Sequence, residues 1–576
     1  MDMDRRTFFR GGALAAGALA ATGLTAGCSP ASTPTAKTAG TGDPESIGDS
    51  WLGEAPVISD EDCTQTIDSD IVVVGAGMAG YFAACAAAEE GANVLLVEKG
   101  ERGSGIRCSA IGAVNSGLQK EHQVEIDTME IMNDFAHYAT NHSSAVFTRL
   151  WADNSGDAVD WYRPIIEDAG LFLELEYNMP PHETYYRMWP TGHGTVAQLN
   201  TPGHLGGAGE VEGRIQDAIL AYFEKSGGKP LFKTTMQRLI QDDGGNVVGL
   251  YATDADGGQI RINAAKGVVL ATGGYASNED MMDALQPEFK KSLAGLFAFP
   301  TATGDGIKAA LWAGGQLCPN PGNVLFGRGA VPPDYEIGDP FNDTVSEYFS
   351  FGEQPFLKVG KDGRRLCNES GPYLHVMNAA AEACPEDRAW YPIWDSNWAE
   401  DVMRFHTIAC STLLMREGGN HDPDEYMSIE VVSEVIEDLV SRGYIIKVDT
   451  LEELAEQLQL TDTEAFLDTV ERYNELYDAQ RDEDFGKEAF RLSAIRTAPF
   501  YGVKLGGKEL ATLQGIRVND QFQALRADNS PIEGLYLIGN DQGGMFANIY
   551  PNFAAGANAG RCATFGRMVG KALAQA

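Results

Sequence analysis

The sequence predicts an α/β protein built on a Rossmann-like nucleotide-binding domain. An apolar run, residues 71–74, leads into Gly75-Ala76-Gly77-Met78-Ala79-Gly80 and then into an alanine-rich stretch, residues 81–90. A second apolar run, residues 94–97, ends at Glu98. Strand, glycine turn, helix, strand and acid in this order are typical of a βαβ unit that binds a dinucleotide, and a glycine-rich turn without a ligand is the alternative.

Each glycine has its own role in such a turn. Gly75 allows the sharp bend, Gly77 allows the backbone to approach a pyrophosphate, and Gly80 allows the helix to pack closely on the strand. The helix N-terminus, at Met78 and Ala79, offers free N–H groups and a partial positive charge to phosphates. Glu98, about 20 residues further on, is placed to accept hydrogen bonds from ribose hydroxyls.

The first 28 residues have the features of an export signal. Residues 5–10, Arg-Arg-Thr-Phe-Phe-Arg, resemble a twin-arginine motif, and residues 11–27 are too short a stretch to span a membrane. Residues 25–28 resemble a lipoprotein cleavage box ending at Cys28, with ordinary cleavage nearby as the alternative. We expect export by the twin-arginine route to the cell envelope or periplasm, with Cys28 as a candidate lipid anchor. Residues 29–63, rich in Pro, Ser, Thr and Gly, are expected to be a disordered linker.

Composition narrows the function classes. The 576 residues leave room, after signal and linker, for one large nucleotide-binding domain with an inserted second domain. The formal net charge of −39 argues against nucleic acid and against an anionic membrane surface as partners. The nine cysteines form no Cys-x-x-Cys pair, so neither an attached haem nor a zinc or other metal site is predicted.

The segment after Glu98 favours FAD over NAD. Lys99 is followed by a loop of glycine and serine, residues 100–112, where a nicotinamide-dependent enzyme would normally continue with a helix and a strand. Small residues such as Ser109 and Gly112 would allow the extended isoalloxazine of FAD to lie along the backbone. These three residues are therefore candidate FAD contacts.

Further motifs establish a resemblance that runs from about residue 68 to the C-terminus. They are residues 271–274 (Ala-Thr-Gly-Gly), 303–306 (Thr-Gly-Asp-Gly), 363–370 (Gly-Arg-Arg-Leu-Cys-Asn-Glu-Ser) and 534–540 (Gly-Leu-Tyr-Leu-Ile-Gly-Asn). With the glycine turn, in this order, they resemble the FAD-dependent fumarate reductase, urocanate reductase and 3-ketosteroid dehydrogenase superfamily. The resemblance implies an FAD-binding domain in two parts, residues 64–318 and 498–576, and an inserted α+β capping domain, residues 319–497. It also implies FAD contacts at Ala271, Thr272, Gly273, Gly304, Asp305, Gly539, Asn540, Asp541, Ala555 and Gly556.

In that superfamily, hydride moves between flavin N5 and a substrate carbon, and a side chain of the cap handles the proton on the neighbouring carbon. Fumarate reductases use an arginine five residues after the Asn of an Asn-Glu pair. Here that position is Tyr373, as in the ketosteroid dehydrogenases and the urocanate reductases. Tyrosine, with an ordinary pKa of about 10, is a credible acid for an enolate-like carbon. A packing role is the alternative, and His375 is a second candidate acid.

This sequence has other residues at the positions where fumarate reductases carry the groups that hold a dicarboxylate. The family histidine before Thr-x-Gly-Gly corresponds to residues 511–515, Ala-Thr-Leu-Gln-Gly, and the family arginine of Asn-Arg-Leu-Gly-Gly-Asn has no counterpart in residues 548–558. That run instead resembles the Tyr-Pro-Gly-x-Gly of ketosteroid dehydrogenases, whose tyrosine grips a ketone oxygen. Tyr550 fits this tyrosine, while Ala554 stands in place of a glycine. Arg404, in the cap, is a candidate for holding a single carboxylate, with a surface salt bridge as the alternative.

The sequence therefore predicts an exported FAD-dependent reductase of an activated C=C bond in an enoate or enone that is not a dicarboxylate, such as an aryl acrylate. Tyr373 would give the proton and Tyr550 would hold the activating oxygen. With no second nucleotide motif for NADH and no haem, electrons would come from a separate quinol-linked or cytochrome partner, in anaerobic respiration. The alternatives are a 3-ketosteroid Δ1-type dehydrogenase running in the oxidative direction, and a non-catalytic flavin electron carrier.

Overall fold

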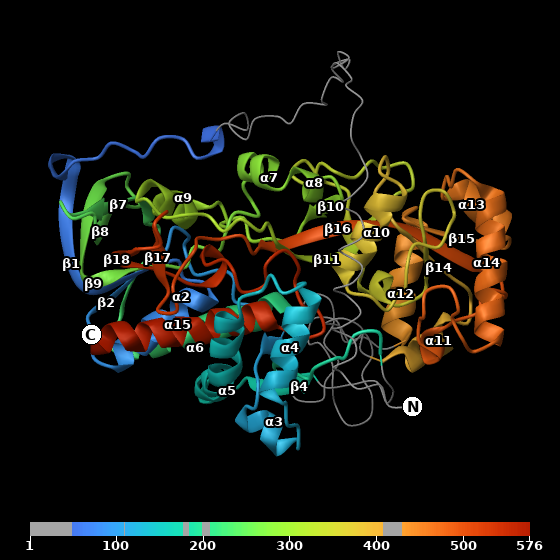
Figure 1. Ribbon diagram of the computed structural model, residues 1–576, viewed down its shortest axis with the longest axis horizontal. Helices are drawn as coiled ribbons and strands as arrows, with labels where there is room; N and C mark the ends of the chain where they lie inside the picture. Colours follow the sequence, from blue (N-terminus) through green and yellow to red (C-terminus); the bar gives the residue numbers. More distant parts are fainter. Residues whose placement is uncertain (1–48, 109, 177–183, 198–207, 407–428) are drawn as a thin grey trace, which may run out of the picture. The chain divides into compact units, whose positions relative to one another are not determined.

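An eight-stranded sheet contains the predicted dinucleotide-binding motif (Figure 1). Strand β1 (Cys63–Val74) pairs in parallel with β2 (Val94–Val97) on one side and with β9 (Gln259–Leu270) on the other. β6 (Lys229–Leu231) extends the sheet beyond β2, and β18 (Pro531–Leu537) extends it beyond β9. The run Ile71–Val74 is buried, as expected for a central parallel strand that is covered on both faces. The other strands of this sheet are β7 (Thr235–Gln241), β8 (Val247–Thr253) and β17 (Gln523–Leu525).

Two helices with many small residues pack tightly against each other on this sheet. They are α2 (Met78–Glu89), which follows the glycine turn, and α15 (Ala557–Gln575) at the C-terminus. A Cβ at Gly566 or Gly570 of α15 would lie 2.5 or 2.2 Å from a carbonyl oxygen of α2. Glycine is therefore required where the two backbones meet. Around them lie α3 (Gly117–Glu121), α4 (Thr128–Tyr138), α5 (Ala145–Asp168), α6 (Ala208–Lys225), and a small sheet of β3 (Ile111–Gly112), β5 (Gly192–Val196) and β4 (Phe172–Glu176).

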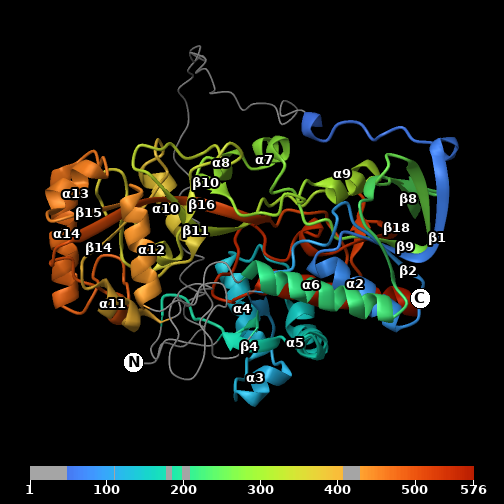
Figure 2. The same ribbon diagram turned by 180° about the vertical axis from the view of Figure 1, so that it is seen from behind.

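A second, seven-stranded sheet is organised around β16 (Phe500–Thr512) (Figure 2). β16 pairs in parallel with β10 (Leu293–Leu296) and antiparallel with β11 (Asn323–Val331), β14 (Tyr391–Trp394) and β15 (Ile445–Val448). Strands β12 (Glu347–Tyr348) and β13 (Leu357–Val359) complete it. Its helices are α10 (Tyr373–Ala383), α11 (Trp398–Phe405), α12 (Ile429–Ser441), α13 (Leu451–Gln457) and α14 (Thr463–Asp478).

Two strands pair across the domain boundaries that the sequence predicted. β10 and β16 lie in the segments expected to belong to the FAD-binding domain, yet both pair within the second sheet. β16 thus carries the chain from the cap sheet back toward the first sheet. In the sequence, α7 (Glu279–Leu285) and α8 (Pro287–Lys290) lie between β9 of the first sheet and β10 of the second, and α9 (Asp305–Trp312) lies between β10 and β11.

The computed structural model describes residues 49–576 except 109, 177–183, 198–207 and 407–428, and Trp51–Ala576 form one unit. The expected signal, Cys28 and most of the expected linker lie outside these residues. The end of that linker differs from expectation, because residues 51–62 contact α9 and the first sheet: Trp312 Nε1 of α9 donates to the Gly53 carbonyl (3.1 Å), and the Tyr251 hydroxyl of β8 donates to Asp60 (2.8 Å). None of the helices in the described part of the chain has the length and apolar character needed to cross a membrane.

Candidate active site

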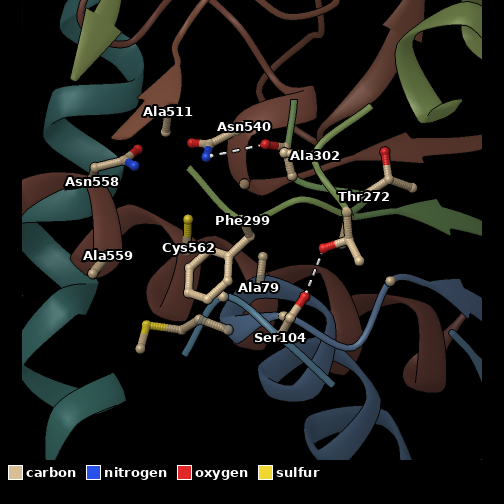
Figure 3. Close-up of a pocket in the computed structure, with 18 of the residues that line it drawn as sticks. Ala79, Ser104, Thr272, Phe299, Ala302, Ala511, Asn540, Asn558, Ala559 and Cys562 are labelled. Carbon is tan, nitrogen blue, oxygen red and sulfur yellow. Dashed lines mark hydrogen bonds between the residues drawn. The ribbon is translucent and has the colours of Figure 1, made fainter. Parts of the chain in front are cut away.

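The carboxyl ends of β1, β2 and β9 meet the cap strands β11 and β16 at one cavity of about 210 Å³ (Figure 3). Val74, Val97 and Ala271 line it from the first sheet, and Val324 and Leu510 line it from the second. Ligands of open α/β sheets bind at this edge. The predicted cofactor residues that line the cavity are Gly75, Gly77, Met78, Ala79, Glu98, Lys99, Ala271, Thr272, Gly273, Asp305, Gly539, Asn540 and Gly556.

The glycine turn has the predicted geometry. Gly75 has φ +102°, and a Cβ there would lie 2.3 Å from the Ala271 carbonyl oxygen. Gly77 caps α2 and lines the cavity, so the first N–H groups of this helix, which have no partner inside the helix, lie at the cavity wall. Gly80 does not line the cavity; a Cβ there would lie 1.8 Å from the Gly75 carbonyl oxygen. It acts through packing, as predicted for the third glycine.

Glu98 and Lys99 are held at the end of β2. The Glu98 carboxylate is buried and accepts hydrogen bonds from the backbone N–H groups of Ala76 (2.8 Å) and Gly100 (2.7 Å). The Lys99 ammonium donates to Asp305 (2.8 Å) and to Thr303 Oγ1 (2.6 Å). The carboxylate is thus fixed beside the glycine turn, where the sequence predicted a ribose contact.

Asp541, a predicted FAD contact, supports the cavity wall from behind. Asp541 is fully buried and accepts hydrogen bonds from Thr272 N (2.5 Å), Thr272 Oγ1 (2.8 Å) and Gly274 N (3.0 Å). Burial raises the pKa of its carboxyl group. Asp541 therefore shapes the turn at Gly273 (φ +97°) instead of lining the cavity.

Three other predicted contacts also lie outside the cavity lining. Gly304, with φ +82°, caps α9. Gly112 N donates to the Gly556 carbonyl (2.8 Å), and the Ala555 carbonyl accepts from Thr191 Oγ1 (2.8 Å). These contacts join β3 and the residue before β5 to the start of α15. Ser109 lies outside the described residues.

The cap end of the cavity contains one of the predicted catalytic residues. Tyr550 lines the cavity, and its hydroxyl accepts a hydrogen bond from Asn558 N (3.1 Å) in the first turn of α15. Gly556, with φ +71°, caps this helix, as the sequence predicted. A helix N-terminus carries a partial positive charge. Tyr550 and α15 therefore form a site for an oxygen atom that gains negative charge.

Tyr373 lies behind the cavity wall and not in it. It is the first residue of α10, is 2% exposed, and its hydroxyl accepts a hydrogen bond from Arg328 Nη2 (3.0 Å). The Arg328 guanidinium lies over the ring of Phe326 (4.5 Å), which lines the cavity. The ring centroids of Phe326 and Tyr373 are 6.2 Å apart. Tyr373 is therefore not a lining residue, and it is shielded from bulk water.

Arg328 and its neighbour Glu353 were not singled out from the sequence. Arg328 is fully buried, donates also to the Tyr348 hydroxyl, and lies 3.7 Å from Glu353 Oε1. Burial raises the pKa of Glu353 to about 7, although Arg328 and Lys358 oppose this shift. The sequence signal was an arginine inside the apolar strand 323–331, because a charge at such a position must find partners in the fold.

The other two predicted catalytic residues do not line the cavity. Arg404 pairs with Asp401 and donates to the carbonyl oxygens of Phe490 (3.0 Å) and Leu492 (3.2 Å), so its guanidinium holds a loop of the cap. His375, in the first turn of α10, is half-buried with its ring centroid 6.2 Å from that of Tyr185, and burial lowers its pKa. Neither position supports the predicted contact with substrate.

Arg107 is a cavity residue that the sequence reasoning did not choose. Its guanidinium lies over the rings of Phe297 (4.4 Å) and Phe299 (4.7 Å) and donates to the Phe297 carbonyl (2.9 Å). Its place in the glycine-serine loop after Glu98 was the available signal.

The lining fits an extended dinucleotide flavin. A glycine cradle and the N-terminus of α2 lie at one end, a fixed carboxylate lies beside them, and the N-terminus of α15 lies at the other end. In Figure 3, Asn540 and Thr272 approach the cavity from one side and Ser104 from the other. Asn540 Nδ2 donates to the Gly273 carbonyl at 3.5 Å.

Comparison with known proteins agrees with this site. The profile of the FAD binding domain family matches residues 70–556, and the chain belongs to that family. Its cofactor is FAD, and it is an FAD-dependent oxidoreductase of the class that acts on C=C and CH–CH bonds.

The relatives are reductases and dehydrogenases. The chain is 27% identical over 507 residues to the vinyl phenol reductase of Lactiplantibacillus plantarum, a match that covers 85% of this chain and 95% of the relative. It is 26% identical over 491 residues to the urocanate reductase of Eggerthella lenta, covering 83% and 70%. The solved 3-ketosteroid Δ1-dehydrogenase of Sterolibacterium denitrificans has the same fold, with a TM-score of 0.67, 19% identity, and coverage of 88% and 99%.

Proposed function

We propose that the protein reduces a C=C bond that is activated by a neutral or singly charged group, such as a ketone, an arene or one carboxylate. The observation that carries this proposal is the lining of the cavity, where the Tyr550 hydroxyl lies at the N-terminus of α15 and the apolar side chains of Val324, Phe326 and Leu510 line the same cavity. The similarity to a vinyl phenol reductase over 95% of that protein supports an aromatic, uncharged substrate.

A dicarboxylate is a poor fit for this cavity. It would need two cationic or strongly hydrogen-bonding sites, since charge-assisted bonds provide most of the affinity for a carboxylate. Among the lining residues that the structure describes, Arg107 and Lys99 are the basic ones. Arg107 is engaged by the Phe297 carbonyl and by two rings, and Lys99 is paired with Asp305.

FAD, when bound and reduced, supplies the hydride that an activated alkene accepts at its β-carbon. The Tyr550 hydroxyl and the partial charge of α15 hold the activating oxygen and stabilise its growing negative charge. Tyr373 donates the proton to the α-carbon, and Arg328 stabilises the phenolate that remains. The Phe326 side chain must turn aside for this transfer, because its ring lines the cavity and lies next to the ring of Tyr373.

We also propose that the protein works outside the cytoplasmic membrane and receives electrons from a separate quinol-linked or cytochrome protein. The twin-arginine pattern of residues 5–10 supports export, because that route carries proteins folded with their cofactor. The sequence contains one dinucleotide motif, which the FAD site uses, and no haem attachment motif.

A substrate panel tests the proposal. The FAD holoenzyme, supplied with reduced viologen without oxygen, is offered 4-vinylphenol, cinnamate, a 3-ketosteroid enone and fumarate. We expect fast oxidation of the viologen with the first two, or with the enone, and the slowest with fumarate. Preferred reduction of fumarate would contradict the proposal. Oxidation of a 3-ketosteroid with an artificial acceptor, in place of reduction, would show the alternative direction, and no turnover with any alkene would show an electron carrier.

The proton donor is tested with Tyr373→Phe. Loss of a general acid lowers turnover by about 100-fold or more while FAD content stays normal. Tyr444→Phe is the matched control, because that buried cap tyrosine donates to the Val345 carbonyl (2.6 Å) and is not among the cavity-lining residues. Equal turnover of the Tyr373→Phe variant and the wild type would remove Tyr373 from the mechanism.

A further inference from the structure

A chain of hydrogen bonds runs behind the cavity wall and joins the two sheets. It begins at the Cys318 carbonyl, which accepts from Gln514 Nε2 (2.9 Å). The Tyr275 hydroxyl lies 2.6 Å from Gln514 Oε1 and 2.8 Å from Gln286 Nε2. Gln286 in turn contacts the Asn323 amide. Glu509 Oε1 lies 2.8 Å from the other polar atom of that amide, so Glu509 ends the chain.

These contacts can be counted as donors and acceptors. Five contacts connect the Cys318 carbonyl, four intervening side chains and Glu509. Each contact needs one hydrogen. Each of the three amides donates toward one neighbour and accepts from the other, and the Tyr275 hydroxyl has a single hydrogen. The four intervening side chains therefore supply four donors, and a backbone carbonyl supplies none.

A carboxylate at Glu509 would leave one contact without a hydrogen. Reversing the Asn323 amide places its NH₂ group against Glu509, but its oxygen then faces the Gln286 oxygen. Reversing Gln286 and Gln514 in turn only moves the conflict along the chain, until two oxygens meet at the Cys318 carbonyl. Because that carbonyl can only accept, no set of amide orientations satisfies all five contacts. A carboxylic acid at Glu509 supplies the missing hydrogen and satisfies them all.

The surroundings of Glu509 contain no compensating cation among the described residues. Its side chain is fully buried on β16, and its Oε2 atom has no hydrogen-bond partner. The elements that approach it are β10 and β11, which pair with β16 here, and the segments that carry Gln286 and Tyr275. Among the side chains named here, Tyr275 is titratable. Lys508, the residue next to Glu509 in the sequence, donates its hydrogen bond to the Ser346 carbonyl (3.1 Å). Burial raises the pKa of Glu509 well above its ordinary value.

We propose that Glu509 is a neutral carboxylic acid in the folded protein, and that its proton is the last donor of the chain that positions the wall of the FAD cavity. Three members of the chain adjoin lining residues: Val324 follows Asn323, Leu510 and Ala511 follow Glu509, and Gly273 lies two residues before Tyr275. Glu509 is thus a positioning residue. It joins the cap sheet to the turn after β9 without touching the cavity itself.

Infrared spectroscopy of the holoenzyme tests the protonation state. The difference spectrum between wild type and Glu509→Gln at pH 7.5 should contain the carbonyl stretch of a protonated carboxyl group, shifted in D₂O. Glu452→Gln, at an exposed position of α13, is the control and should not remove this band. A carboxylate band in place of the acid band would overturn the proposal.

The pH dependence of stability gives a second test. A folded-state pKa above the unfolded value means that the folded protein retains the proton as pH rises, while the unfolded chain loses it above about pH 4.3. Stability from this group is therefore lost as pH rises, by about tenfold in the unfolding constant per pH unit. Glu509→Gln does not titrate, so its melting temperature relative to wild type should rise steadily from pH 5 to pH 8. A difference that is constant with pH would overturn the proposal.

The positioning role needs a variant without the donor. In Glu509→Leu, the Asn323 oxygen no longer receives a hydrogen bond. Because this unsatisfied buried oxygen disturbs the cavity wall, we expect the FAD affinity to fall by about 5- to 100-fold. Glu509→Gln retains a donor and should restore FAD binding to nearly the wild-type value. Equal FAD affinities for Leu, Gln and wild type would show that the chain does not position the wall. If the Leu variant does not fold, the two tests above still decide the protonation state.

Discussion

The two sides of the cavity are built in different ways. On the side of the first sheet, much of the wall consists of backbone and small residues, at the turns after β1 (Gly75 to Ala79) and after β9 (Ala271 to Gly273) and at the N-termini of α2 and α15. On the cap side, behind Phe326, large polar side chains are packed together, including Arg328, Tyr373 and Glu353. Cofactor binding thus depends on backbone geometry, whereas the proton transfer proposed above depends on side-chain contacts that form only when the cap folds.

The largest effect on FAD affinity is expected at Gly80, where the backbone of α2 contacts the backbone of the glycine turn. In Gly80→Val the added side chain would start 1.8 Å from the Gly75 carbonyl oxygen, and neither backbone can move without opening the turn. Overpacking of this kind costs about 3 kcal/mol, which corresponds to a roughly 100-fold loss of FAD affinity. Flavin absorbance per mole of purified protein measures the loss. Gly209→Ala is the control, because a Cβ there meets nothing within 4 Å. Normal FAD content in Gly80→Val would show that the wall is not rigid.

An intermediate effect is expected on the cap side. Arg328→Lys keeps a positive charge but cannot reach Tyr373, Tyr348 and Glu353 together, since an ammonium lacks the planar guanidinium fork. Loss of one charge-assisted hydrogen bond, about 1.5–3 kcal/mol, should lower turnover about 10- to 100-fold, while FAD content stays normal. The surface variant Arg496→Lys serves as the control. A fall in FAD content with unchanged turnover per flavin would reverse the proposed division of roles between the two sides.

The smallest effect is expected at Arg404, where the structure departs from the sequence-based prediction. Arg404→Ala removes hydrogen bonds to the Phe490 and Leu492 carbonyls and a partly exposed ion pair, worth about 1 kcal/mol together. The melting temperature should fall by on the order of 1 °C, and kcat and KM should change by less than about twofold. A large rise in KM for a carboxylate substrate would restore Arg404 as a substrate-binding residue.

The family comparison sharpens the same contrast. The profile match spans residues 70–556 and so includes both sheets, yet the relatives act on substrates as different as vinyl phenol and urocanate. The fold is shared with a 3-ketosteroid dehydrogenase. On the proposed function, we expect the specific substrate to be selected by residues near Phe326 and Tyr550, and not by the cofactor site.

The sequence by itself determined the cofactor side of this protein. The order of strand, glycines, helix and acid predicted the βαβ unit, and 13 of the predicted cofactor residues line the cavity together with Tyr550. The physical reason is that these contacts are local. A positive φ, a close backbone approach and a helix N-terminus each depend on a few consecutive residues, which a motif records directly.

Only the tertiary structure decided the cap side. Arg328 reaches Tyr373 across 45 residues, and Glu509 reaches Asn323 across more than 180, so neither pairing leaves a pattern in the sequence. The sequence selected Arg404 and His375 for their chemistry, but the fold used Arg404 to hold a loop and packed His375 beside Tyr185. The role of a long polar side chain depends on which partner the folded chain brings within about 3 Å, and that distance is a property of the packed sheets alone.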